Sequence, residues 1–259
     1  MKIVVLVKSV PEQTADWRFS GDLTLDRANV EGRLSQLDEY AIEQAVQVAE
    51  SGVPAEITCL TMGPAPAADA LRKALAMGGD QGVHVVDDAL HGSDALATSY
   101  VLARAVQRLG FDLVVCGMAS TDAEMSVIPS MLAERLGVAQ ATNASALSTD
   151  GASVTVRRET DTATEELAVT LPAVVSVTDQ SGEPRYPAFK AIIAARKKPV
   201  QTWSLADLDV DPGKVGLDAA ATAVLDTRPQ PPRAAGTVIV DEGDAAVRLA
   251  DYLTAASFL

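Results

Sequence analysis

The fold is decided by the segment DLVVCGMASTD at residues 112–122, together with the segment PSMLAERLG at residues 129–137. The apolar run at 113–116 is typical of a strand covered on both faces. Gly117 ends this run, and short polar residues follow before a helix that closes on a glycine. Ligands of open α/β sheets bind at such strand–helix connections, where free N–H groups attract phosphate. A plain strand–helix connection with a Ser, Thr or Asp cap is the alternative interpretation.

Composition limits the class of protein. The chain has 259 residues, of which 48% are hydrophobic and only 4% aromatic, so it can bury a core of Ala, Val and Leu. The formal charge of −14 argues against nucleic-acid binding, because phosphates would be repelled. A partner surface is therefore expected to be basic or apolar.

The two cysteines and the apolar runs indicate the cellular compartment that is expected for the protein. Cys59 and Cys116 both lie in apolar strand-like runs, which predicts buried thiols in a reducing, cytoplasmic setting rather than a disulfide or metal site. No apolar run reaches the roughly 18 residues of a membrane span. Residues 1–8 are interrupted by Lys8 and are interpreted as a strand, not a signal peptide.

Strand and helix patterns alternate in the first half of the chain. Strands are expected at 2–10, 56–62, 82–86 and 112–116, and each is followed by a helix; these helices end near residues 50, 77, 109 and 137. A possible hairpin lies at 19–25. This alternation predicts an α/β fold with a mostly parallel, doubly wound sheet.

The rhythm changes after residue 137. Four successive strands are expected at 141–147, 153–159, 164–170 and 173–178, as an added antiparallel segment with a hairpin signal at Asp150-Gly151. The predicted domain organisation is an α/β nucleotide-binding domain at 1–198 and an extended C-terminal arm at 199–259. The arm has little core of its own, so we expect it to pack on a second subunit.

Residues typical of catalysis are few. His84 and His91 are not at metal-ligand spacing, and no Gly-x-Ser-x-Gly or Gly-x-Gly-x-x-Gly motif is present. The segment at 212–216 contains Gly-Lys but lacks the spacing of a phosphate loop. These observations favour a binding and docking protein over an enzyme.

Several stretches, in order along the whole chain, resemble the β subunit of electron transfer flavoproteins. They are Ile3–Pro11, Asp38–Ala45, Gly63-Pro64, Arg72–Asp80, His91–Asp94, Ser120–Asp122, Leu171–Val177, Glu183–Pro187 and Arg196–Lys198.

This resemblance implies an adenine-nucleotide α-hydrolase-like fold and one half of a heterodimer. The α subunit would hold most of a shared FAD, and the β subunit would hold a structural AMP or, in bifurcating members, a second FAD. The heterodimer would accept electrons from flavin dehydrogenases and pass them to an acceptor oxidoreductase. The flavin supplies the redox chemistry and the protein positions it.

The resemblance also implies a nucleotide site. Its residues would be Leu6, Val7, Met62, Gly117, Met118, Ala119, Ser120, Thr121, Asp122, Ser126, Val127, Ile128 and Pro129. We expect backbone N–H groups at 126–128 to hold the phosphate and the side chains at 120–122 to shape the pocket. Met118 stands where Asn is frequent, and residues 123–126 replace a Gly-rich run, so AMP is expected rather than a second FAD, with an empty site as the remaining alternative.

Residues 183–194 resemble the family's recognition loop for partner dehydrogenases. Phe189 occupies the position of its apolar anchor, and Tyr186, Pro187 and Ile192 flank it. The alternative is that Phe189 lies in the protein's own core.

A different class remains open from the residues alone. A flavin-free adenine-nucleotide sensor, or a hydrolase-like homodimer, would share the α/β fold. The four-strand insertion and the long arm argue against it, since a small sensor needs neither.

Overall fold

The computed structural model describes residues 1–233 and 235–258. Contacts within the chain divide it into a first unit, residues 1–225, and a second unit, residues 226–259. Each unit is described by itself.

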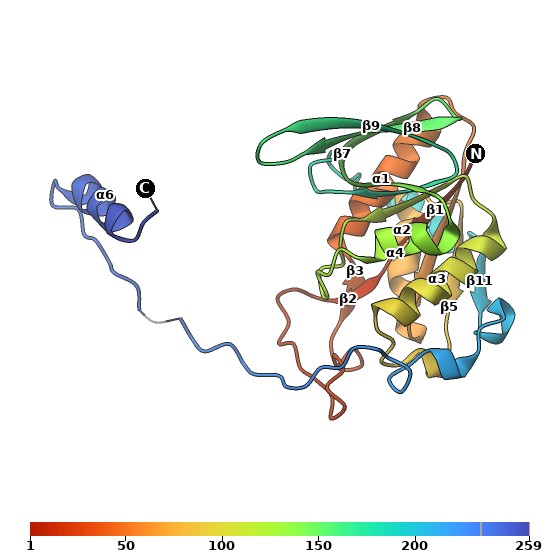
Figure 1. Cartoon of the computed structure of the whole chain (residues 1–259), viewed down its shortest axis with the longest axis horizontal. Coiled ribbons are helices and arrows are strands. Elements are labelled where there is room, and N and C mark those ends of the chain that lie inside the picture. The colour runs from red at the N-terminus through yellow and green to blue at the C-terminus, as the bar shows by residue number, and fades with distance from the viewer. Residues whose placement is uncertain (234, 259) are drawn as a thin grey trace. The chain divides into compact units, whose positions relative to one another are not determined.

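The first unit is built on a nine-stranded sheet (Figure 1). The strand order is β11-β5-β4-β1-β6-β10-β7-β8-β9. The parallel strands are β1 (Lys2–Leu6), β4 (Glu56–Met62), β5 (Gln81–Val85), β6 (Leu113–Gly117), β10 (Ala173–Val177) and β11 (Val200–Trp203). β7 (Ala139–Thr149) is parallel to β10 and antiparallel to β8 (Ser153–Glu159), which pairs with β9 (Thr164–Thr170) in the same way.

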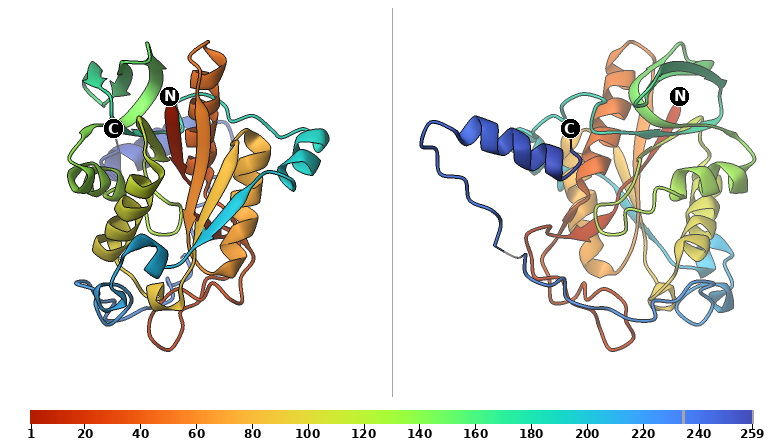
Figure 2. Two further views of the ribbon diagram at one scale, coloured as in Figure 1. Left: turned by 90° about the vertical axis from the view of Figure 1, so that its right-hand side faces the viewer. Right: turned by 60° about the vertical axis from the view of Figure 1, so that its left-hand side comes forward.

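Helices cover both faces of the parallel strands, as the left view of Figure 2 shows. α1 (Gln36–Glu50) and α2 (Ala68–Met77) pack on one face, and α3 (Ala95–Leu109) and α4 (Ile128–Leu136) pack on the other. Alternate residues of β1 enter opposite cores: Ile3 and Val5 join the first core, and Val4 and Leu6 join the second. The predicted doubly wound α/β fold is confirmed.

The predicted first strand was wrong in its length. β1 ends at Leu6, and a separate strand β2 (Ser9–Pro11) leaves the main sheet to pair with β3 (Gly32–Leu34). The chain turns away because the Lys8 N–H donates to the Asp38 carboxylate at 2.8 Å instead of continuing the sheet ladder. The hairpin expected at 19–25 is present as an antiparallel bridge between Phe19 and Leu25.

Two predictions for the second half of the chain need correction. β10 was expected in the antiparallel segment, but it lies between β6 and β7 and is parallel to both. The arm was expected from residue 199, but β11 pairs with β5 at the sheet edge, and the chain stays with the first unit to Leu225. Trp203 and Leu205 are buried there, so this stretch has a core that the sequence pattern did not show.

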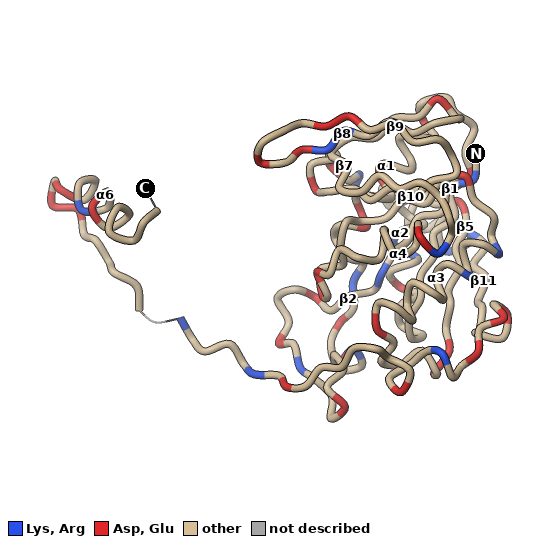
Figure 3. The backbone as a smooth tube through the Cα atoms, in the orientation of Figure 1, with Lys and Arg blue, Asp and Glu red and all other residues tan. Residues whose placement is uncertain are grey.

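Two further features of the structure are the distribution of its acidic residues and the length of its apolar helices. Acidic residues are spread over the whole trace rather than gathered in one tract (Figure 3). None of the helices formed by the described residues is long and apolar enough to cross a membrane.

The second unit contains one helix, α6 (Ala245–Ala255), among its described residues. The helix buries none of its residues, and Val247, Leu249 and Tyr252 are exposed. A helix with an uncovered apolar side is not stabilised by packing within its own unit.

Candidate functional site

The predicted nucleotide residues meet at the carboxyl edge of the sheet. Leu6, Met62 and Gly117 end the strands β1, β4 and β6, of which β1 lies between β4 and β6. Parallel strands present their carboxyl ends at the same edge, so the structure brings Val7 and the loop at 118–127 to one place.

Gly117 allows α1 to approach the end of β6 closely. A Cβ atom on Gly117 would lie 2.8 Å from the carbonyl carbon of Leu37 and 2.9 Å from Asp38 Oδ1. Contacts this short do not occur between real atoms of these types, so any side chain would push the start of α1 away from the loop.

Asp122 is the centre of a buried ion cluster. Its carboxyl group is 1% exposed and accepts hydrogen bonds from Lys8 Nζ at 2.8 Å and from the Arg27 guanidinium. Burial alone would raise the pKa of Asp122, but the two cations outweigh burial and hold the pKa at about 2. Lys8 Nζ also donates to Ser120 Oγ at 3.1 Å. Two side chains at one end of the predicted site, Ser120 and Asp122, are therefore held by Lys8, which lies between β1 and β2.

Asp38 is a second buried carboxyl group at this edge. It accepts the Lys8 backbone N–H, and burial raises its pKa to about 7. The Thr121 N–H donates to Ser35 Oγ at 3.4 Å, so the residue that precedes α1 contacts the loop.

Sequence reasoning did not assign Lys8, Arg27, Ser35 or Asp38 to the site. Lys8 carried a usable signal, because a cation near the carboxyl end of the predicted first strand lies at the carboxyl edge of the sheet. Arg27 carried none: it lies 95 residues from Asp122 in an irregular stretch.

The loop before α4 has an unusual backbone. Glu124 and Ser126 adopt the left-handed region at φ values of 49° and 56°, which non-glycine residues rarely do. No side chain caps α4. Within residues 1–233 and 235–258, the N–H groups of Ser126, Val127 and Ile128 donate to no protein acceptor. Free N–H groups at a helix N-terminus suit an anionic group.

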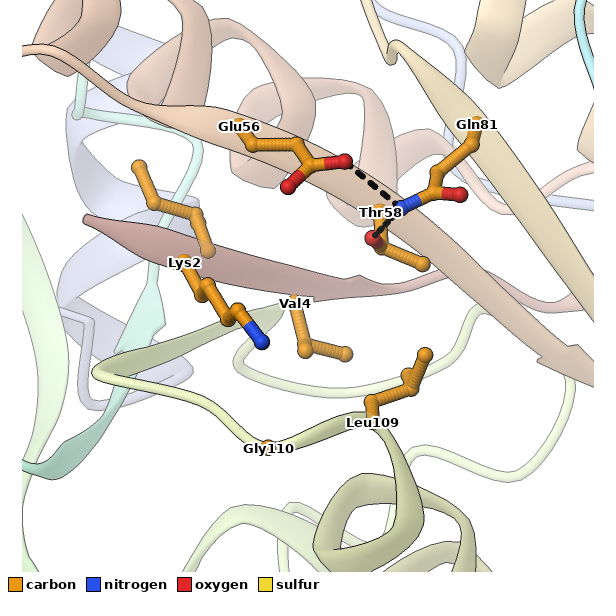
Figure 4. Close-up of a pocket in the computed structure, with 8 residues that line it drawn as sticks. Lys2, Val4, Glu56, Thr58, Gln81, Leu109 and Gly110 are labelled. Carbon is orange, nitrogen blue, oxygen red and sulfur yellow. Dashed lines mark hydrogen bonds between the residues drawn. The ribbon is translucent and has the colours of Figure 1, made fainter.

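The hollow shown in Figure 4 lies at the opposite edge of the sheet. Lys2, Glu56 and Gln81 line it, and Gln81 Nε2 donates to Glu56 Oε1 at 2.9 Å. Its volume is about 50 Å³, enough for one or two water molecules, so a nucleotide does not fit there.

The predicted recognition residues form an exposed apolar surface. We call residues 183–194 the docking segment; it includes the first six residues of α5 (Phe189–Ala195). Tyr186 is 96% exposed and Phe189 is 78% exposed, and Ile192 is also exposed while Pro187 is half-buried. The alternative that Phe189 lies in the core is therefore wrong. Figure 2, left, shows this short turquoise helix projecting from the side of the first unit.

The remaining reactive side chains have structural contacts. His84 Nε2 lies 2.9 Å from the Gly63 carbonyl, and His91 Nε2 lies 2.8 Å from Asp22 Oδ2. Cys59 and Cys116 are buried free thiols, and burial raises the pKa of Cys59 to about 12. In the described part of the chain, no three His, Cys, Asp or Glu side chains are arranged to hold a metal ion.

The first unit is thus a doubly wound α/β domain, a class whose members bind their ligands at the carboxyl edge of the sheet. The family model described as "Electron transfer flavoprotein domain" matches residues 22–208. Electron transfer flavoprotein subunit beta of Mycobacterium leprae (strain TN) is 43% identical over 259 residues, 98% of this chain and 97% of the relative. The protein of the same description from Megasphaera elsdenii is 31% identical over 252 residues, 94% and 93% of the two chains.

The chain belongs to the electron transfer flavoprotein β subunit family. It takes part in electron transfer as an electron carrier, and the relatives it matches are described as subunits of flavoproteins. These findings confirm the predicted family. They give no support to the alternative of a flavin-free sensor or hydrolase-like homodimer.

Proposed function

We propose that the chain is the β subunit of a heterodimer that shares one FAD with an α subunit. The heterodimer accepts electrons from flavin dehydrogenases and passes them to an acceptor oxidoreductase in the cytoplasm. The flavin, when bound, supplies the redox chemistry. The second unit supports this assembly, because α6 exposes an apolar side that a partner subunit would cover.

The carboxyl-edge site is proposed to hold AMP. The observation that carries this proposal is the set of free N–H groups at 126–128 at the start of α4, in the loop whose Asp122 binds Lys8 and Arg27. These groups would hold the phosphate, and apolar side chains at the strand ends, Leu6, Val7 and Met62, would line the rest of the site. AMP is favoured over a second FAD, because Met118 and Glu124 add bulk and a carboxylate to the loop.

Mass spectrometry of the denatured, natively purified heterodimer tests this site. We expect AMP and FAD in equal amounts. Ser126→Asp should abolish AMP binding, because a carboxylate would stand beside the phosphate donors, and it should leave FAD in place. Thr162→Asp, an exposed change in the β8–β9 turn, is the control and should retain AMP. A heterodimer that releases no adenylate would contradict the proposal.

The docking segment is proposed to bind flavin dehydrogenases through Phe189. Burial of this exposed ring in a partner pocket would contribute roughly 2–4 kcal/mol, as interface hot spots do. Phe189→Ala should therefore slow reduction of the heterodimer by a dehydrogenase at least tenfold, with folding and yellow colour unchanged. Leu96→Ala, which trims another exposed apolar side chain on α3, is the control. Equal reduction rates in the Phe189 variant and the wild type would remove the docking role.

A further inference from the structure

The docking segment is fixed at both of its ends to helices of the first unit, while its middle is free. At its start, Ser181 and Arg185 contact α1. At its end, Ala195 and Lys198 contact α2. The exposed apolar side chains lie between these two points. The contacts that hold the segment in place therefore leave its exposed apolar side chains free to bind a partner.

The first attachment is an ion cluster around Arg185. Its Nε and its backbone N–H both donate to Glu43 Oε2, at 2.7 and 3.0 Å, and Nη2 donates to Glu43 Oε1 at 3.0 Å. Nη1 and Nη2 also donate to the two oxygens of Glu50, at 2.7 and 2.9 Å. The guanidinium thus makes forked contacts with two carboxylates on the same face of α1, which a lysine ammonium cannot reproduce.

The cluster is partly protected from water. The Glu43 side chain is buried, and Gln47 Nε2 also donates to it at 3.0 Å. Close by, Gln44 Nε2 donates to the Ser181 carbonyl at 2.6 Å. Gly182 turns the chain between these contacts at a φ of 122°. Burial reduces screening by solvent, so this cluster is stronger than an ordinary surface ion pair.

The second attachment uses backbone carbonyls. Arg72 on α2 donates to the Ala195 carbonyl at 3.1 Å. Lys198 Nζ donates to the carbonyls of Leu75 and Gly79 at 2.9 and 2.6 Å, and Ala195 is buried against the core. The end of α5 is therefore fixed independently of Arg185.

We propose that Arg185 is a positioning residue, which Glu43 and Glu50 hold so that the docking segment keeps its partner-binding conformation before a partner arrives. This inference rests on the proposed function of the segment. Its occupant is a protein surface with an apolar pocket for Phe189. A segment that is ordered in advance loses less conformational entropy on binding, so the attachment acts on affinity and not on electron transfer within the bound complex.

Steady-state kinetics on the co-expressed heterodimer tests the proposal, with a flavin dehydrogenase purified by its ability to reduce that heterodimer. Glu50→Gln removes one exposed partner of Arg185 and should raise the KM for the heterodimer about threefold. Arg185→Lys keeps the charge but loses the fork and should raise the KM about tenfold. In both variants we expect kcat and FAD content to match the wild type. Asp69→Asn, an exposed change on α2, removes the same charge and should leave KM unchanged.

Hydrogen exchange of the heterodimer without any partner gives a second readout. Amides at 186–192 should exchange faster in Glu50→Gln and Arg185→Lys, whereas amides of β1 and β6 should exchange as in the wild type. Glu50 is 60% exposed, so its variant is expected to fold even if Arg185→Lys does not.

The outcomes separate this inference from the proposed function. If Phe189→Ala raises the KM but Glu50→Gln changes neither KM nor exchange, the positioning role is wrong and docking stands. If Phe189→Ala itself has no effect on reduction, the proposed docking function is wrong. A fall in kcat with an unchanged KM in Glu50→Gln would also contradict a positioning role.

Discussion

Replacing Asp38 with asparagine is expected to remove much of the change in stability between pH 5 and pH 8. Asp38 is buried beside the Lys8 backbone, and burial raises the pKa of its carboxyl group from 3.8 to about 7 in the folded chain. Between these two pH values the folded state binds a proton that the unfolded state has released. Stability therefore falls as the pH rises through this window and levels off above the folded pKa.

The size of the effect follows from the shift. One pKa unit corresponds to about 1.4 kcal/mol, so the full window is worth about 4 kcal/mol, of which roughly 2–3 kcal/mol falls between pH 5 and pH 8. Asp122 has the opposite effect, and in a lower pH range. Its pKa is lowered to about 2, so its contribution to the free energy of unfolding is present above its ordinary pKa and is lost as the pH falls towards 2. The two carboxyl groups thus act in different pH ranges.

Urea unfolding of the heterodimer at one protein concentration and at several pH values measures the effect. The quantity to follow is the unfolding free energy of Asp38→Asn minus that of the wild type, because contributions from other groups cancel in this difference. It should increase by roughly 2–3 kcal/mol from pH 5 to pH 8. Asp69→Asn is the control and should give a flat difference. A flat difference for Asp38→Asn as well would refute the assignment of a buried, proton-holding carboxyl group.

Two further predictions concern the backbone at the site. Gly117→Ala should destabilise the chain by about 1–3 kcal/mol, because its Cβ atom would overlap Leu37 and Asp38. Gly21→Ala is the control and should be neutral, because Gly21 has open space around it. Thermal unfolding of the two variants checks this, and equal melting temperatures would contradict it. Ser126→Gly should raise stability by about 0.5 kcal/mol, because glycine adopts the observed left-handed conformation without strain; the same measurement checks it, and a fall in melting temperature would be the contrary result.

Sequence reasoning located the candidate site but not the groups that shape it. The strand ends near Met62 and Gly117 were predicted, because apolar runs and the residues that end them are local features, whereas Leu6 was assigned to the site by resemblance. The ion cluster at Asp122 was missed, because its partner Arg27 comes from an irregular stretch with no periodic signal. Docking residues were chosen by resemblance, and only the structure showed that Phe189 is exposed rather than in the core.

The sequence by itself determined the alternation of strands and helices, and with it a sheet covered by helices on both faces. The reason is that the hydrophobic periods of 2 residues in strands and 3.6 residues in helices can be recognised in the sequence. Only the tertiary structure decided where the chain returns to itself: β11 beside β5, Arg27 on Asp122, and Arg185 on Glu43, which lies 142 residues away. Such pairings depend on which elements become neighbours once the core has formed. Charged residues in irregular stretches carry no local pattern that names their partner.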